Sequence, residues 1–191
     1  MEKNKNYVKL CGIVSQDPTQ SHTECNREYY TAILEIERAS GTKDEVPMLV
    51  PERIARTMKQ GKKMIAEGNV ITHNEGGHLL VRVKVRYAAV VDAKVECCNM
   101  AELQGYICKE PYYRDLGKRE ITNLIVAVNS GRHAYYVPVI VWGRDARRLA
   151  KCSVGEQVSV HGRLQSRKYI DKSIEVGTAY EVSATTIGVT Q

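Results

Sequence analysis

Long apolar runs are missing from this sequence of 191 residues. No segment approaches the roughly 18 consecutive apolar residues that a membrane-spanning helix needs. The amino-terminal segment MEKNKNYVKL also lacks the apolar core of a secretory signal peptide. These two absences argue against a membrane partner and predict a cytoplasmic protein.

Cysteine pairs of the C-x-x-C kind are absent too, although the chain contains six cysteines. Cys97 and Cys98 are adjacent, a spacing that does not fit a zinc finger. His22 and Cys25 are separated by two residues, but no matching second pair follows. We therefore expect no metal site, and free, packed thiols in a reducing cytoplasm.

Catalytic motifs are lacking as well. Neither a phosphate-binding G-x-x-x-x-G-K-[ST] loop nor a G-x-S-x-G nucleophile elbow occurs. No group of spaced carboxylates suggests two-metal nuclease chemistry, and the five histidines are scattered without an acid partner. The sequence thus predicts a binding protein that is not an enzyme and uses no cofactor and no small-molecule substrate. Its formal net charge of +6 favours an anionic partner.

The segment VPVIVWGRD, residues 137–145, has the pattern of a half-buried strand. Its three valines alternate with Pro138, Ile140 and Trp142, the only tryptophan of the chain. A period of two places the valines on one face of the strand and places Tyr136 and Trp142 on the other.

The segment GEQVSVHGRLQSRKY, residues 155–169, is a second strand of this kind. Aliphatic side chains take one face, and Arg163, Arg167 and Tyr169 take the other. Rings and guanidinium groups on one outward face are typical of a platform where unstacked bases stack while cations meet their phosphates. An ordinary sheet with a solvated face gives the same pattern, so these two strands alone leave both interpretations open.

Four segments, LQGYICKEP, TNLIVAVNSG, VPVIVWGRDA and VGEQVSVHGRLQSRKY, resemble the bacterial single-stranded DNA-binding proteins and follow that family's order. The resemblance covers roughly residues 101–189. It implies an OB fold, a small five-stranded barrel with a helix between its third and fourth strands. By motif position it also implies that Tyr136, Trp142 and Tyr169 stack on bases.

An internal repeat indicates a second copy of the same fold. Gly12 and Gly105 belong to a set of positions that recur at an offset of 93 residues. Gly68 and Gly162 recur at an offset of 94. Matches in this order predict an all-β protein with short helices, built from two tandem five-stranded OB barrels. The expected domains are residues 1–95 and 99–191.

The hydrophobic pattern of the first repeat predicts five strands and one helix. The expected strands cover residues 7–15, 29–38, 45–50, 62–72 and 79–91. The segment SHTECNRE is expected to be a polar loop. The expected helices are residues 52–59 and, in the second repeat, residues 145–152. Asp145 is the expected N-cap of the latter, because its carboxylate can accept an early backbone N–H.

The first repeat lacks the aromatic groups of the second. Glu45 stands where the second repeat has Tyr136, and Pro51 stands in place of Trp142. Neither replacement offers a flat π face. We therefore expect the second repeat to carry the main binding face.

Two other features of the first repeat suggest contacts of a different kind. Ile65 and Ile71 are expected on the outward face of its fourth strand, which favours a surface covered by the other domain or a second chain. Arg82, Lys84 and Arg86 alternate with valines on its fifth strand and could extend a phosphate track. A solvated edge strand defended by positive charge explains the same three cations.

Cations of the second repeat are the candidate phosphate ligands, because neutralising phosphates releases counterions. Tyr112 and Tyr113, in the first long loop of this repeat, are further stacking candidates, and we expect one of them to contact a base. The candidate phosphate ligands are Arg114, Lys118, Arg119, Arg144, Arg163, Arg167 and Lys168.

The sequence thus predicts a single-stranded DNA-binding protein without strong sequence preference. By resemblance it acts in DNA replication, repair and recombination, and the family's four OB domains per assembly imply a homodimer here. The chain stops without the acidic tail through which the family recruits partners. Two alternatives stay open: a primosome-type or scaffolding OB protein that works through protein contacts, and a binder of single-stranded RNA.

Overall fold

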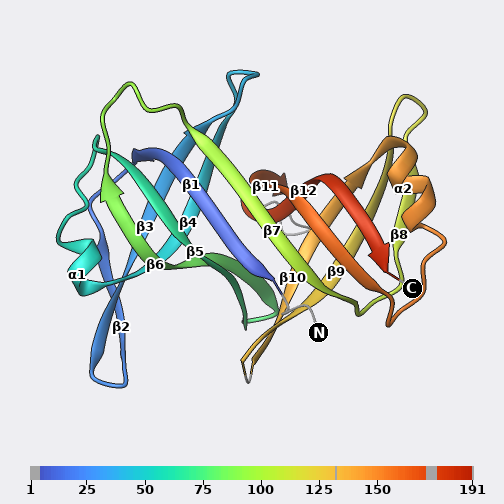
Figure 1. The fold of residues 1–191 in the computed structure, drawn as a ribbon, viewed down its shortest axis with the longest axis horizontal. Coiled ribbons are helices and arrows are strands. Elements are labelled where there is room, and N and C mark those ends of the chain that lie inside the picture. Colours follow the sequence, from blue (N-terminus) through green and yellow to red (C-terminus); the bar gives the residue numbers. More distant parts are fainter. Residues whose placement is uncertain (1–4, 132, 171–175, 191) are drawn as a thin grey trace. The chain divides into compact units, whose positions relative to one another are not determined.

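The computed structural model describes residues 5–131, 133–170 and 176–190, and strands dominate it (Figure 1). The strands of the first repeat are β1 (Asn6–Val14), β2 (Thr19–Glu24), β3 (Arg27–Glu37), β4 (Lys43–Pro51), β5 (Lys63–Glu75) and β6 (His78–Val90). Those of the second are β7 (Cys98–Ile107), β8 (Tyr112–Asp115), β9 (Glu120–Ser130), β10 (His133–Trp142), β11 (Gln157–Ile170) and β12 (Val176–Thr190). Helix α1 (Glu52–Ala55) follows β4, and α2 (Gly143–Leu149) follows β10.

Each repeat closes into its own barrel. In the first, β1 pairs antiparallel with both β5 and β3, β3 pairs with β4, and β4 pairs in parallel with β6, the neighbour of β5. In the second, β7 pairs with β11 and β9, β9 pairs with β10, and β10 pairs in parallel with β12. This order is that of an OB barrel, so the predicted fold class is confirmed.

The recurring glycines lie where a side chain would collide with the backbone of another strand. A Cβ on Gly105 would stand 2.2 Å from a backbone oxygen of β9, and one on Gly162 would stand 2.2 Å from a backbone oxygen of β12. Gly12 and Gly68 meet backbone oxygens at 2.3 and 2.2 Å in the first barrel. These strands can pass at such distances only because the residues lack a Cβ. The glycines that recur in the sequence therefore make the same kind of backbone contact in both barrels.

The prediction that Asp145 caps α2 is wrong. The helix begins at Gly143, and Trp142 holds the N-cap position in an extended conformation without a side-chain hydrogen bond. Gly143 has a φ of +62°, which turns the chain from β10 into the helix. Asp145 lies in the first turn, and its carboxylate accepts a hydrogen bond from Arg148 at 3.1 Å. Helix α1 is also shorter than predicted, because it ends at Ala55.

Two strands are not in the predicted set. The segment predicted as a polar loop contains most of β2, which pairs with β3, and β8 pairs in the same way with β9. Cys25 and Asn26 have φ values of 48° and 59° and form the two-residue turn between β2 and β3. Every residue of β2 is exposed, so no hydrophobic alternation marks the strand.

The chain divides into two compact units. One contains Tyr7–Ile71 and Val81–Met100, and the other contains Met1–Asn6, Thr72–Leu80 and Ala101–Gln191. The tip of the β5–β6 hairpin thus belongs to the unit of the second barrel. Within that unit the backbone N–H of Tyr136 donates a hydrogen bond to Thr72 Oγ1 at 2.9 Å. The domain limits near residues 95 and 99 stay a prediction.

The six cysteines are free thiols. Cys11 is buried, and burial raises the pKa of its thiol. Cys25 and Cys97 are exposed, so the expectation of packed thiols is wrong for these two. Within the described residues, no three His, Cys, Asp or Glu side chains gather as a metal site would require. Neither of the helices in this part of the chain is long and apolar enough to cross a membrane.

Candidate nucleic-acid interface

Strand β10 presents two of its aromatic side chains outward. Val137, Val139 and Val141 are buried inside the second barrel, as the alternation predicts. Tyr136 and Trp142, on the opposite face, are 50% and 40% exposed. Two rings on the outside of a folded barrel are available for stacking.

The indole of Trp142 is held in place by β12. Its Nε1–H donates a hydrogen bond to Ser183 Oγ at 3.1 Å. Ser183 is opposite Ile140 in the parallel pairing of β10 with β12, so the bond ties the end of β10 to its neighbour. The indole edge is therefore fixed while the ring stays partly exposed, which reduces the ordering required when a base stacks on it.

Trp142 and Ser183 form a row across β10 and β12, and Arg163 extends this row onto β11. It is opposite Ser183 in the antiparallel β11–β12 register, and directly opposed residues point to the same side of a sheet. Its Nε is buried and, among the described residues, has no hydrogen-bond partner. Buried donors are nearly always paired in folded proteins, so this N–H is suited to donate a hydrogen bond to a phosphate or base oxygen.

A carboxylate interrupts the positive charge of this face. Glu181 on β12 is buried and accepts a hydrogen bond from Gln165 at 2.8 Å. It also lies 3.9 Å from Arg167 Nε. Arg167 therefore already has an anionic neighbour and must share its charge with any phosphate. The sequence pattern gave no sign of Glu181, because its place on this face depends on the pairing of β11 with β12.

Tyr169 lies near the end of the β11–β12 hairpin. It is opposite Gly177, and a Cβ on that glycine would stand 2.5 Å from the ring carbon Cζ of Tyr169. The ring thus packs on the backbone of the neighbouring strand, a position open only because residue 177 is glycine. This contact occupies one side of the ring.

Strand β8 adds a ring and a cation to the same face. Arg114 is opposite Ile121, which is itself opposite Trp142, so Arg114 and Trp142 point to the same side. Tyr112 is 62% exposed, and the guanidinium of Arg114 lies 5.5 Å from its ring centre. The pair offers a π surface beside a positive charge.

Tyr113 points to the other side of β8. It is opposite Thr122, which is buried and donates a hydrogen bond to Ala146 O at 2.7 Å. Burial, together with a hydrogen bond to Glu120, raises the pKa of Tyr113. Arg147 Nε donates to Glu120 at 3.1 Å and lowers the pKa of that carboxyl group. The structure thus places Tyr113 in a side-chain network away from Trp142.

The remaining candidate cations are exposed but lie on different elements of the second barrel. Lys118 and Arg119 are exposed in the turn between β8 and β9, and Arg144 is exposed in the first turn of α2. Lys168 is exposed on β11 but alternates to the side opposite Arg167. The structure brings Arg114 and Arg163 into one row with Trp142, and does not bring Lys168 there.

The first barrel repeats the frame without the stacking groups. Pro51 holds the N-cap position of α1, as Trp142 does for α2. Glu45 is exposed on β4. Ile65 and Ile71 are half-buried on β5. The three cations of β6 alternate with buried valines and therefore face outward: Arg82, Lys84 and Arg86.

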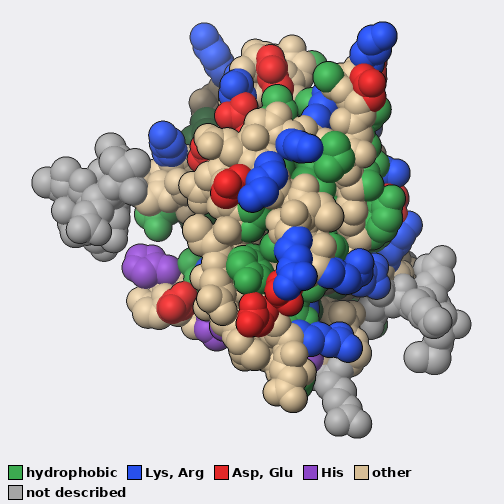
Figure 2. Space-filling model, turned by 90° about the vertical axis from the view of Figure 1, so that its left-hand side faces the viewer, with side chains coloured by type: hydrophobic (Ala, Val, Ile, Leu, Met, Phe, Trp, Pro, Cys, Tyr) green, Lys and Arg blue, Asp and Glu red, His purple; other side chains and the backbone are tan. Residues whose placement is uncertain are grey.

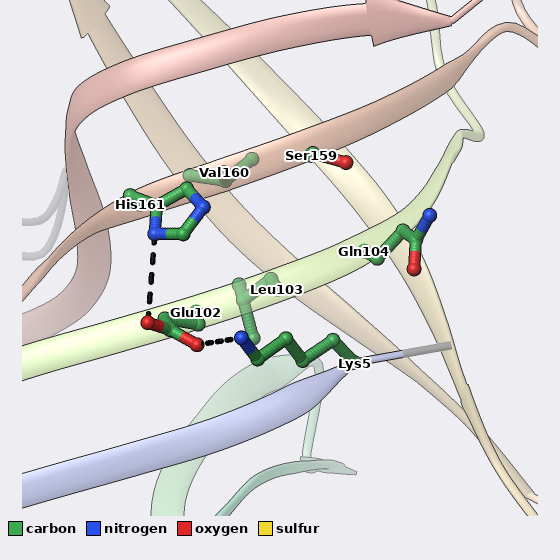
Figure 3. Close-up of a pocket in the computed structure, with 7 residues that line it drawn as sticks. All are labelled: Lys5, Glu102, Leu103, Gln104, Ser159, Val160 and His161. Atoms are coloured by element: carbon green, nitrogen blue, oxygen red, sulfur yellow. Dashed lines mark ion pairs between the residues drawn. The ribbon is translucent and has the colours of Figure 1, made fainter. Parts of the chain in front are cut away.

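A pocket of about 300 Å³ lies on the second unit, beside β7 and β11 (Figure 3). Glu102 forms an ion pair with Lys5, and its carboxylate lies 3.6 Å from His161 Nδ1. The backbone N–H of Gln104 donates to Lys5 O at 2.7 Å. No candidate from the sequence lies in this pocket, whose residues come from three separate segments.

Comparison with known proteins supports the resemblance. The model of the single-strand binding protein family matches residues 98–190. No curated protein sequence matches the chain.

Solved structures match over nearly the whole chain. The wild-type single-stranded DNA binding protein from Thermus aquaticus has a TM-score of 0.76 at 19% identity, with 99% of this chain and 94% of that chain covered. A deletion variant of the same protein has a TM-score of 0.78 at 20% identity, with 100% and 97% covered. At such identity the likeness shows the fold. We conclude that this chain is a tandem two-barrel protein whose second barrel, residues 98–190, belongs to the single-strand binding protein family.

Proposed function

We propose that this protein binds single-stranded DNA on the outward face of its second barrel, without strong sequence preference. The observation that carries the proposal is the row formed by Trp142, Ser183 and Arg163 across β10, β12 and β11. This row lies in the part of the chain that matches the single-strand binding protein family. It joins a fixed ring to a buried N–H donor.

Stacking supplies the sequence-independent part of the affinity. Trp142, Tyr136 and Tyr112 are exposed on the outside of the second barrel, and Tyr169 is half-buried at the end of its β11–β12 hairpin. Stacking a base on an aromatic side chain contributes about 1–3 kcal/mol. Every base has a π face, so this contribution does not depend on which base is bound.

Phosphate contacts supply the salt-dependent part. Arg163, which is half-buried on β11, and Arg114, whose guanidinium lies next to the Tyr112 ring, are the proposed phosphate contacts. Arg167 must exchange the carboxylate of Glu181 for a phosphate, which reduces its net contribution. Each phosphate that is neutralised releases counterions, so binding weakens as salt rises.

The proposed cellular role is to protect and organise single strands in DNA replication, repair and recombination. The family and fold are those of DNA-binding proteins, and we propose no catalytic step. We further propose that the chain acts in the cytoplasm as a homodimer, which would present four OB barrels. Ile65 and Ile71, half-buried on the outward face of β5, are the proposed dimer contacts.

A titration followed by tryptophan emission tests the proposal, because Trp142 is the only tryptophan. Oligo-dT, oligo-U and a duplex are added separately at low and moderate salt. We expect strong quenching by oligo-dT, weaker quenching at higher salt, and little effect of the duplex. Quenching by oligo-U of equal strength would instead favour single-stranded RNA. If no strand quenches the emission or binds by anisotropy, the scaffolding alternative replaces this proposal.

A further inference from the structure

We propose that the first barrel carries a second site for single-stranded DNA, centred on His22, Tyr29 and Lys84. The inference rests on the function proposed above. It extends that function to the first barrel, which has no aromatic residue at the positions of Tyr136 and Trp142. The aromatic ring of the new site lies one strand away from Pro51, the residue that corresponds to Trp142.

The strand registers show the displacement. Tyr29 on β3 is opposite Pro51 on β4, as Ile121 on β9 is opposite Trp142 on β10. In the second barrel, the aliphatic residue is on β9 and the aromatic residue is opposite it on β10. In the first barrel, the aromatic residue is on β3 and proline is opposite it on β4. The aromatic ring of the first barrel thus lies on β3, next to β4, which is the strand that corresponds to β10.

Two side chains cover the Tyr29 ring, which is 8% exposed. The His22 ring stacks on it, with centroids 5.4 Å apart and an interplanar angle of 16°. Lys84 Nζ lies 4.9 Å from the centre of the same ring. His22 is itself exposed on β2, so its ring is the outermost π surface of the stack. A base can stack on His22 while Tyr29 supports it from below.

Lys84 corresponds to Ser183 of the second barrel. It is opposite Leu49 in the parallel pairing of β4 with β6, as Ser183 is opposite Ile140 in the pairing of β10 with β12. In both barrels this position contacts the aromatic group of the outward face. The serine holds the indole by a hydrogen bond, whereas the lysine places an ammonium group over the tyrosine ring.

A carboxylate lies beside the cation. Lys84 Nζ is 3.3 Å from Glu24, which is exposed near the end of β2. We infer that Lys84 exchanges this carboxylate for a phosphate when a strand binds. An exposed ion pair of this kind is worth little, so the exchange costs little.

Arg82 and Arg86 flank Lys84 on the same outward face of β6. The backbone oxygen of Arg86 accepts a hydrogen bond from Arg53 Nη2 at 3.1 Å, which brings a further cation close. Figure 2 looks onto this barrel and shows Lys and Arg side chains spread among hydrophobic and acidic ones. Strand β6 pairs with β4 and neighbours β5, so it is no edge strand. Protection of an edge therefore does not explain these three cations.

Labelled oligo-dT of two lengths tests the inference. An OB domain occupies about 4–16 nucleotides, so a strand of roughly 8 occupies one barrel and one of roughly 35 is long enough for both. We expect His22→Ala to weaken binding of the long strand at least about five-fold and to leave the quenching of Trp142 emission by the short strand unchanged. We expect Lys84→Gln to lower the slope of log affinity against log salt for the long strand by about 0.7. The matched control is Lys43→Gln, which removes an exposed, paired cation of the same barrel.

Trp142 emission separates failure of this inference from failure of the proposed function. If the short strand quenches the emission and neither variant changes binding of the long strand, the first barrel has no such site and the inference is overturned. If no strand quenches or binds, the function itself is wrong. Urea unfolding of each variant shows whether the barrel is intact. Should His22→Ala unfold it, Arg82→Gln with Arg86→Gln decides the question through the salt slope.

Discussion

Trp142 combines an exposed ring with a fixed indole edge, so its removal should affect binding more than folding. We expect Trp142→Ala to weaken oligo-dT binding about five-fold or more, since one stacked base contributes about 1–3 kcal/mol. Fluorescence anisotropy of a labelled oligonucleotide measures the change. The control is Val154→Ala, which shortens an exposed apolar side chain of the same barrel. Equal affinity of Trp142→Ala and the wild type would show that no base stacks there.

Asp44 and the partly exposed Arg38 form an ion pair in the first barrel. Arg38 Nε and Nη2 donate to the carboxylate at 2.6 and 2.5 Å, and Asp44 is fully buried. Arg38→Ala leaves a buried charge without this partner, which we expect to lower the free energy of unfolding by about 3 kcal/mol. Urea unfolding measures the loss. Lys43→Ala breaks an exposed pair with Glu35 and should cost under about 0.5 kcal/mol; a similar loss in both variants contradicts the argument.

Glu120 should make the second barrel sensitive to acid. Arg147 lowers the pKa of Glu120 in the folded protein. A carboxyl group with a lowered folded pKa stabilises the protein above its unfolded pKa of about 4.3, and this contribution is lost as the pH falls through the folded value. We expect Glu120→Gln to lower Tm at pH 7 and to show a smaller fall in Tm on acidification. Parallel Tm curves for variant and wild type from pH 7 to pH 2 would refute this.

At the scale of strands, two glycines of the second barrel predict a contrast between two substitutions. A Cβ on Gly162 would meet Ser183 O at 2.2 Å, whereas a Cβ on Gly188, also in a strand, meets nothing within 4 Å. We expect Gly162→Ala to lower the free energy of unfolding by about 2 kcal/mol or more, because β11 and β12 must separate. Gly188→Ala should change it by under about 0.5 kcal/mol. Similar values for the two would mean that the strands separate without cost.

Strands with an alternating pattern were predictable, and others were not. The valines of β10 marked the strand and correctly placed Tyr136 and Trp142 outside. Strand β2 has no buried residue, so it forms through backbone pairing with β3 and leaves no hydrophobic signal. The start of α2 depends on the positive φ of Gly143, which a capping pattern centred on Asp145 does not reveal.

The candidate site was predictable where one strand defines it. Trp142 and Arg163 follow from the alternation within β10 and β11. Glu181 and the stack of His22 on Tyr29 arise from pairing between strands, and an alignment of the two repeats position by position does not show them. The residues that sequence reasoning missed are thus those whose neighbours come from other strands.

At the scale of the whole molecule, the proposed homodimer gives a measurable mass. Sedimentation should report twice the chain mass of 21.5 kDa. Ile65→Lys should return the protein to the single-chain mass, because it places a charge on the proposed apolar contact. Thr31→Lys, on the outward face of β3, is the control. A wild type of single-chain mass, or an unchanged dimer in Ile65→Lys, contradicts the proposed interface.

The repeat made two barrels predictable, but not how the chain divides between compact units. Recurring glycines and valines report on pairing inside each barrel. The grouping of Thr72–Leu80 with the second unit depends on contacts such as that between Thr72 and Tyr136. Such a contact joins residues 64 positions apart and leaves no periodic trace in the sequence.

The strand order within each barrel also bears on biosynthesis. All strands that close the first barrel end by Val90, so this barrel can close while the rest of the chain is still on the ribosome. At about 5–20 residues per second, the second barrel is completed roughly 5–20 s later. During that interval the strands of the first barrel are already paired with one another. Two similar repeats in one polypeptide thus mature one after the other, which limits exchange of strands between them.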